Sequence, residues 1–156
     1  MDDKHTEESA YEDFINIRMW RALRALQINF QNQTLDKSGI SLQEWRCLVN
    51  LARVGNVHLR ELARLANLDA TYTSRAALEL ESKHLIRRYD DPKDARRKRL
   101  EITDAGQNIV NEIWSRAREL DKKIQAKIGK VRFRALKEAL EMIKAIDHDR
   151  DKDDHR

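Results

Sequence analysis

A run of hydrogen-bonding side chains follows an aspartate that is well suited to begin a helix. Asp69 is a typical N-cap residue, so we expect a helix from Ala70 to about Lys83, which we call the reading helix. Its first turns carry Thr71, Tyr72, Thr73, Ser74 and Arg75. An arginine can hold guanine O6 and N7 with two parallel hydrogen bonds, and hydroxyl groups can contact base edges or phosphates. These residues could therefore read DNA from the major groove.

A basic segment comes after the reading helix. Alternating apolar residues predict strands at Ile86–Tyr89 and Leu100–Ile102, and Asp90–Asp94 holds the only proline of the chain and predicts the turn between them. We call this expected β-hairpin, residues 86–102, the wing.

The wing carries groups that could hold DNA beside the major groove. Arg96 could enter the minor groove, where a narrow and negative A·T-rich groove attracts guanidinium groups. Asp94 could orient Arg96 by a charge-assisted hydrogen bond. Phosphate contacts are expected from three further cations, of which strand alternation could turn one away: Arg97, Lys98 and Arg99.

Each of these groups also has a purely structural interpretation. Arg75 could pair with Glu79 one helical turn away, and Asp94 with Arg96 could merely hold the loop. The charge distribution favours binding. Residues 53–99 carry twelve Lys/Arg and seven Asp/Glu, a net of +5 in a chain whose total is +4. Positive charge is thus concentrated where it could neutralise phosphates.

The elements before the reading helix complete a helix-turn-helix. Leu59–Ala66 predicts a short amphipathic helix, and Asn67-Leu68-Asp69 predicts the turn. Further upstream, Ser41 and Glu44 have the spacing of a capping box for a helix that Gly55 ends. Helix, turn, helix and wing together predict a winged helix-turn-helix.

Three longer amphipathic helices flank this module. We expect them at about Ser9–Leu35, from the Thr103 cap to about Ile128, and beyond Gly129 to about Ile146. Their apolar stripes exceed what a module of about 65 residues can cover, and an exposed stripe on a monomer would promote aggregation. The economical solution is a homodimer in which the terminal helices of two copies pack together.

Several other classes are disfavoured. The single cysteine excludes an intrachain disulfide and a cysteine-based metal cluster, which fits a reducing cytoplasm. No run of about 18 apolar residues predicts a membrane span, and the acidic N-terminus is unlike a secretory signal. His148 and His155 are interpreted as part of a charged tail, disordered or weakly helical, rather than a metal site. Without a phosphate loop or a triad, we expect no enzyme, no catalytic residue and no cofactor.

By these residues the chain resembles the multiple antibiotic resistance regulator (MarR) family of bacterial winged-helix repressors. The similar segments are ISLQEWRCLVNLARVG, LRELARLANLD, SRAALELES and the wing DPKDARRKRLEITDAG. The most specific pattern is Asp91-Pro92-x-Asp94-x-Arg96, followed by Leu100 to Gly106. The match is close over about residues 40–106, while the flanking helices match in length and pattern only.

The resemblance implies a homodimer that binds a pseudo-palindromic, double-stranded DNA operator and responds to a small aromatic or acidic effector. Three positions depart from the family pattern. His84 stands where a glycine often precedes the first wing strand, Tyr72-Thr73 replaces Thr-Val, and His58 stands where Ser or Thr commonly caps a helix. His58 could therefore cap weakly or serve a phosphate instead.

The aromatic residues and the cysteine have two interpretations each. Met19, Trp20 and Trp45 could line an effector pocket, with Trp114 as a further candidate, although aromatics at helical spacing are more often core. Cys47 could sense oxidants, but its position midway along a helix favours a small buried hydrophobe.

Together these features predict a mainly α fold with a small β-hairpin wing. We expect an N-terminal tail and dimerisation helix at 1–39, the winged helix-turn-helix at 40–106, dimerisation helices at 107–147 and a disordered charged tail at 148–156. The favoured function is a cytoplasmic, sequence-specific DNA-binding regulator, a homodimeric repressor released by an effector. The alternatives are a winged-helix module that binds protein, and a redox regulator that acts through Cys47.

Overall fold

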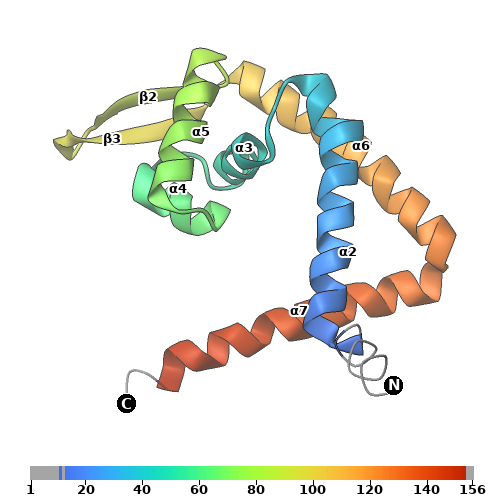
Figure 1. Cartoon of the computed structure of the whole chain (residues 1–156). Coiled ribbons are helices and arrows are strands. Elements are labelled where there is room, and N and C mark those ends of the chain that lie inside the picture. The colour runs from blue at the N-terminus through green and yellow to red at the C-terminus, as the bar shows by residue number, and fades with distance from the viewer. Residues whose placement is uncertain (1–10, 12, 154–156) are drawn as a thin grey trace, which may run out of the picture. The chain divides into compact units, whose positions relative to one another are not determined.

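The fold is mainly helical with a small antiparallel sheet, as predicted. The structure is a computed structural model that describes residue 11 and residues 13–153 (Figure 1). At residues 95–96 and 146–153 it describes the backbone and not the side chains. The chain divides into two compact units between Ser115 and Arg116. No helix among the described residues is long and apolar enough to cross a membrane.

The N-terminal helix is less regular than predicted, and residues 9, 10 and 12 of the predicted span lie outside the described part of the chain. The α-helix α2 spans Ile15–Phe30 and continues into a π-helical turn at Gln31–Leu35 and a 3₁₀ turn at Asp36–Ser38. Gly39 then adopts a left-handed conformation with φ of 63°, which ends the run. Thr34 and Leu35 are buried, whereas α2 itself buries no residue within this chain.

The helix-turn-helix has the predicted boundaries. Helix α3 spans Leu42–Val54, α4 spans Leu59–Ala66 and α5, the reading helix, spans Ala70–Ser82. The Ser41 hydroxyl accepts the Glu44 amide N–H, and the Glu44 carboxylate accepts the Ser41 N–H, which confirms the capping box.

The sheet has three strands rather than the predicted two. Strand β2 spans Ile86–Asp91, β3 spans Asp94–Ile102 and a two-residue strand β1, Val57–His58, adds the order β1-β3-β2. The turn predicted over Asp90–Asp94 is shorter, because the Asp91 carboxylate accepts the Lys93 N–H at 2.8 Å and the ladder extends to an Asp91–Asp94 pair. The β2–β3 hairpin projects from the helices (Figure 1).

The core joins α3, α4, α5, the sheet and the first half of the next helix. Helix α6 spans Asp104–Ile128, and its Val110 and Ile113 are buried with apolar residues that include Leu48, Leu62 and Leu80. The Thr103 hydroxyl accepts the Gly106 N–H and so caps α6, as predicted. This core holds α5 and the wing on one framework.

In the second unit, Gly129 ends α6 with φ of 86°, as predicted, and helix α7 spans Lys130–Asp153. The boundary predicted between helix and tail at residue 148 does not coincide with the end of α7. Residues 154–156 of the predicted tail lie outside the described part of the chain.

Candidate nucleic-acid interface

The N-terminus of α5 is built by a tight turn with its own side-chain support. Asn67 ends α4 in a left-handed conformation with φ of 50°, and its carbonyl accepts Arg46 Nη2–H at 2.8 Å. Two residues later, Asp69 Oδ1 accepts the Tyr72 N–H at 2.8 Å, which confirms the predicted N-cap. The capped turn fixes where α5 begins and which way its first residues face.

The face of α5 that lies opposite the core exposes most of the predicted reading residues. Thr71, Tyr72 and Arg75 are exposed, and Ser74 is half-buried. A surface groove of about 550 Å³ runs along this face between α4 and α5 and is lined by Leu59, Ala70, Thr71, Ser74, Arg75 and Leu78. The exposed side of α5 therefore presents hydroxyl and guanidinium groups together.

Thr73 is a correction to the predicted reading set. Its side chain is 0% exposed, and its hydroxyl donates to the Asp69 carbonyl at 2.7 Å. Thr73, Ala76, Ala77 and Leu80 lie three or four residues apart, so they share the buried side of the helix. Thr73 therefore stabilises the start of α5 and does not face solvent.

The Arg75 side chain forms no ion pair or hydrogen bond with any other residue that the structure describes. In particular, the structure shows no pair with Glu79, which was the structural alternative for this guanidinium. An exposed arginine with uncommitted donors retains its capacity for two parallel hydrogen bonds to a ligand.

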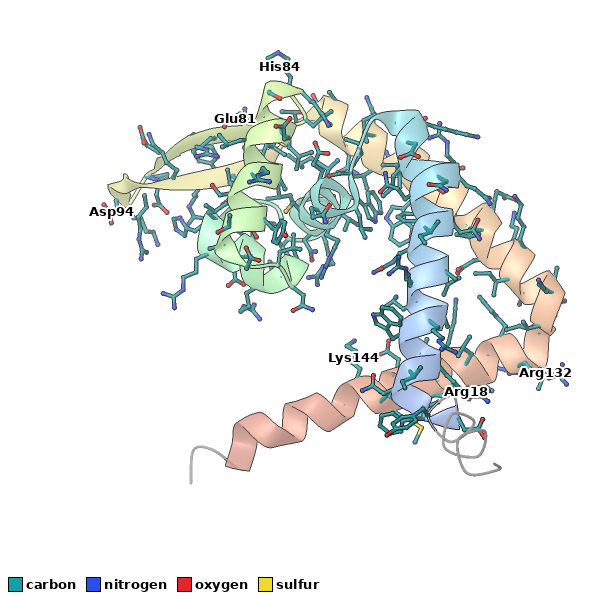
Figure 2. All side chains as sticks on the ribbon, in the orientation of Figure 1. Arg18, Glu81, His84, Asp94, Arg132 and Lys144 are labelled. Atoms are coloured by element: carbon teal, nitrogen blue, oxygen red, sulfur yellow. The ribbon has the colours of Figure 1, made fainter. Side chains whose placement is uncertain are left out.

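The cations of the wing divide into outward and inward groups. The side chains of Arg97 and Lys98 are 68% and 55% exposed, whereas that of Arg99 is 29% exposed. Lys98 pairs with Asp90, and Arg97 Nε lies 3.9 Å from a carboxylate oxygen of Asp94. Asp94 stands at the far end of the wing (Figure 2). The predicted Asp94–Arg96 contact concerns a side chain outside the described set.

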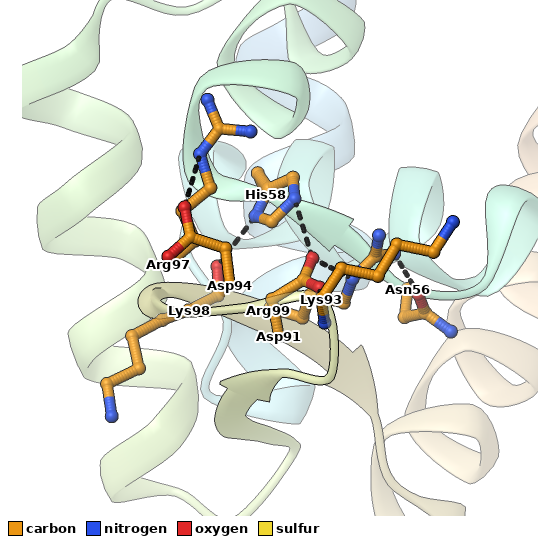
Figure 3. Close-up of polar contacts among 8 residues, drawn as sticks. All are labelled: Asn56, His58, Asp91, Lys93, Asp94, Arg97, Lys98 and Arg99. Atoms are coloured by element: carbon orange, nitrogen blue, oxygen red, sulfur yellow. Dashed lines mark hydrogen bonds and ion pairs between the residues drawn. The ribbon is translucent and has the colours of Figure 1, made fainter.

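Arg99 is the cation that strand alternation turns inward, and it ties the end of β2 to the segment before β1. Its Nε donates to Asp91 Oδ2 at 2.7 Å and its Nη1 donates to Asn56 Oδ1 at 2.6 Å (Figure 3). Asp91 is 6% exposed. The Lys93 amide and the Arg99 guanidinium lower the pKa of the Asp91 carboxyl below its ordinary range.

A basic groove between α4 and β3 was missed by the sequence analysis. It has a volume of about 700 Å³ and is lined by His58, Leu59, Arg60, Glu61, Arg64, Arg97 and Lys98. Arg64 pairs with Glu61 at 2.6 Å, so the remaining lining is strongly cationic. The cationic residues come from segments almost forty residues apart, which the β1–β3 pairing helps to bring together. The groove could accept phosphate groups.

A partly buried ion pair ties the end of α5 to the start of α3. Lys83 Nζ donates to Glu44 Oε1 at 2.5 Å and to the Gly39 carbonyl at 2.7 Å. Glu44 is 5% exposed. Burial raises the pKa of Glu44, but hydrogen bonds from Lys83 and Ser41 outweigh it, so the pKa lies below its ordinary value of 4.5. The reading helix is therefore anchored at both ends.

Cys47 is 0% exposed, and burial raises the pKa of its thiol to about 11. The thiolate is the reactive form of cysteine, so this thiol is unreactive at neutral pH. The structure therefore favours the buried hydrophobe over the oxidant sensor.

The predicted effector residues lie in different environments. Trp45 is 8% exposed, and its ring lies about 6 Å from the rings of Phe30, in a tilted arrangement, and Trp114, edge-on. Trp20 is 58% exposed, with the Arg24 guanidinium 5.7 Å from its ring, and Met19 is half-buried. A groove of about 350 Å³ between α3 and α6 is lined by Val49, Asn50, Ala52, Arg53, Gln107, Val110, Asn111 and Trp114.

Comparison with known proteins agrees with this architecture. The sequence model of the MarR family matches residues 40–98, which hold α3, α4, α5 and most of the wing. Residues 40–98 of the chain therefore match a MarR-family domain. The resemblance to this family inferred from the sequence is confirmed over these residues.

The similarity to known proteins extends beyond the matched domain. The chain is 28% identical over 133 residues to the HTH-type transcriptional regulator FarR of Neisseria gonorrhoeae, covering 85% of this chain and 90% of that protein. A probable transcriptional regulator from Pseudomonas aeruginosa is 25% identical, with a TM-score of 0.76 over 85% of this chain and 98% of that one. NadR in complex with 4-hydroxyphenylacetate is 28% identical, with a TM-score of 0.67 over 83% and 91% of the two chains.

Proposed function

We propose that this chain is a MarR-family transcriptional regulator, a homodimeric repressor that binds a pseudo-palindromic operator in double-stranded DNA. In this account α5 enters the major groove, where Thr71, Tyr72, Ser74 and Arg75 contact base edges or phosphates. The wing lies along the neighbouring minor groove, with Arg97 and Lys98 on phosphates and Arg96 in the groove itself.

The observation that carries the proposal is the uncommitted Arg75 on the exposed face of a firmly anchored helix. Asp69 caps the first turn of α5, and Lys83 ties its end to Glu44 and Gly39. Specific contacts need a rigidly held donor, and the donors of Arg75 are not used within the part of the chain that the structure describes.

The homodimer is supported by apolar side chains that a single chain leaves exposed. On α2, Trp20, Leu23, Leu26 and Ile28 are 44–58% exposed. On α7, considered by itself, the exposed apolar side chains are Val131, Leu136, Leu140, Met142 and Ile143. On water-soluble proteins, exposed apolar patches of this kind mark interfaces with another chain. A two-fold dimer would place two copies of α5 about one helical turn of DNA apart.

Release by a small aromatic or acidic effector is the second part of the proposal. NadR, which is similar to this chain over most of its length, was solved in complex with 4-hydroxyphenylacetate. Here the α3–α6 groove offers the Trp114 ring, the Arg53 guanidinium and three side-chain amides. Met19, Trp20 and Trp45 remain candidates in the dimer. An effector acts only if it binds the DNA-free form more tightly than the DNA-bound form.

A fluorescence anisotropy titration tests the function directly. The full chain is titrated into a labelled duplex from the region upstream of its own gene and, as the matched control, into a shuffled duplex of equal length and composition. We expect the upstream duplex to bind at least about a hundredfold more tightly, since specific protein–DNA affinities exceed nonspecific ones by a factor of this order or more. Equal affinity for the two duplexes would favour a winged-helix module that binds protein.

A further inference from the structure

Leu78 is an exposed leucine on the reading helix α5. Its side chain is 55% exposed. Among the described residues of the winged helix-turn-helix, 40–106, the large apolar or aromatic side chains that are exposed are Val54, Tyr72 and Leu78, and the last two belong to α5. A single exposed leucine is common on protein surfaces, so its neighbours decide what it can do.

Leu78 shares its face of α5 with the polar reading residues. Because an α-helix has 3.6 residues per turn, positions 71, 74, 75 and 78 fall within about 100° of one another around the helix axis. The side chains at these positions, Thr71, Ser74, Arg75 and Leu78, line the groove of about 550 Å³ between α4 and α5. The exposed face of α5 therefore carries an apolar side chain three residues after its guanidinium group.

The rest of the groove lining is apolar. Ala70, the first residue of α5, and Leu59, the first residue of α4, complete it. Leu59 is half-buried and packs against the core, so its position is fixed by the fold. Leu59 and Leu78 together place apolar surface in the same groove as the hydroxyl and guanidinium groups of α5. This combination suits a ligand that presents a methyl group beside hydrogen-bonding atoms.

Thymine is the base that presents such a group in the major groove of DNA. Its C5-methyl group projects there beside the O4 acceptor, whereas adenine, guanine and cytosine present hydrogen-bonding groups alone. Arg75 and Leu78 are about 4.5 Å apart along the helix axis, and successive base pairs are about 3.4 Å apart. A helix that holds Arg75 against a guanine therefore brings Leu78 to a base one or two pairs away.

We propose that Leu78 is a specificity-determining residue, which together with Leu59 holds the C5-methyl group of a thymine one or two base pairs from the guanine that Arg75 contacts. The proposal rests on the proposed function, because α5 is taken to lie in the major groove. Removing one methyl group from water favours thymine roughly fourfold over an otherwise identical base that lacks it. Leu78 thus adds an apolar preference to the hydrogen bonds of Arg75.

Deoxyuridine tests this contact, because it lacks only the C5-methyl group of thymidine and keeps every hydrogen-bonding group. The full chain is titrated into the labelled duplex from the region upstream of its own gene, and into copies in which deoxyuridine replaces thymidine at one position at a time. In each half-site we expect one position at which the wild-type chain loses about fourfold in affinity. Leu78→Ala should bind the thymine duplex several-fold more weakly and should not respond to deoxyuridine at that position.

Two further variants separate the methyl contact from a general loss of affinity. Leu78→Met keeps an apolar side chain of similar volume and should keep most of the response to deoxyuridine. Val54→Ala, at an exposed aliphatic position on α3, is the matched control and should keep all of it.

The outcomes distinguish this proposal from the proposed function. An equal response to deoxyuridine in the wild type and Leu78→Ala would overturn the proposal about Leu78 alone. The same holds if no position responds while the upstream duplex still binds more tightly than a shuffled one. If the upstream duplex binds no more tightly than the shuffled duplex, the proposed function fails, and the role of Leu78 fails with it.

Discussion

At the scale of single residues, two exposed cations have different tasks in the proposed DNA binding. Arg75 has uncommitted donors on the face of α5, whereas Lys98 lies on the wing beside the basic groove. A bidentate contact to guanine discriminates between sequences, but a lysine beside phosphates contributes mainly to charge neutralisation.

Arg75→Ala should therefore weaken binding to the cognate duplex by about 1–3 kcal/mol and leave shuffled DNA almost unaffected. Lys98→Ala is the matched comparison. It should weaken binding to both duplexes alike and reduce the slope of log affinity against log salt by about one unit. Anisotropy titrations at several salt concentrations measure both effects. Equal losses on the two duplexes for both variants would refute this division of tasks.

The pKa of Glu44 leads to a second residue-scale prediction. A carboxyl whose pKa is lower in the folded chain stabilises it above the ordinary pKa of 4.5, and the contribution disappears as the pH falls through the folded value. Glu44→Gln should lower the free energy of unfolding by about 1–2 kcal/mol at pH 7. Urea unfolding should show that this difference shrinks below about pH 4. If the difference in unfolding free energy between the wild type and Glu44→Gln stayed constant down to acid pH, the ion pair of Glu44 with Lys83 would contribute nothing to stability.

At the scale of elements, the sequence was most informative where partners lie within about four residues. The capping box of Ser41 with Glu44, the Asp69 cap and the Gly129 break are local, and the structure confirms them. The bridge from Glu44 to Lys83 spans 39 residues, and that from His58 to Lys98 spans 40. Such contacts depend on how the elements pack, which local patterns do not encode.

Two further differences separate the sequence predictions from the structure. Strand β1 is two residues long, too short for an alternating pattern, and exists because Val57 and His58 pair with β3. Thr73 was predicted to read DNA from its residue type, yet its spacing of three, four and seven residues to Ala76, Ala77 and Leu80 indicates the buried side of α5. Spacing, rather than polarity, was the signal available for this residue.

The junction between the wing and α6 supports a prediction about one element contact. At Gly106, an added Cβ would lie 2.1 Å from the Leu85 carbonyl oxygen and 2.8 Å from Ile102 Cγ1. Gly106→Ala should therefore force the two backbones apart and cost about 1–3 kcal/mol of unfolding free energy. Ala105→Ser, at the exposed neighbouring position, is the control. Thermal unfolding followed by circular dichroism compares the two, and equal melting temperatures would contradict the close contact.

At the scale of the whole molecule, the proposed DNA binding requires two chains. Leu26 is 44% exposed on α2 and belongs to the apolar stripe predicted from the sequence. Leu26→Glu should shift the chain toward monomer in sedimentation equilibrium and weaken binding to the cognate duplex by at least about tenfold, since one reading helix is lost from the complex. Unchanged far-ultraviolet circular dichroism would show that the core remains folded. A variant that stays dimeric would place the interface elsewhere.

The central claim is that a dimer of this chain reads a specific DNA sequence with two copies of α5. The most direct measurement is to incubate the purified full chain with a random duplex library and to sequence the fragments that it retains. The account predicts enrichment of an inverted repeat whose half-sites are separated by about 10 base pairs, and loss of that enrichment with Arg75→Ala. Retained fragments without any enriched motif, or the same motif for wild type and Arg75→Ala, would contradict it.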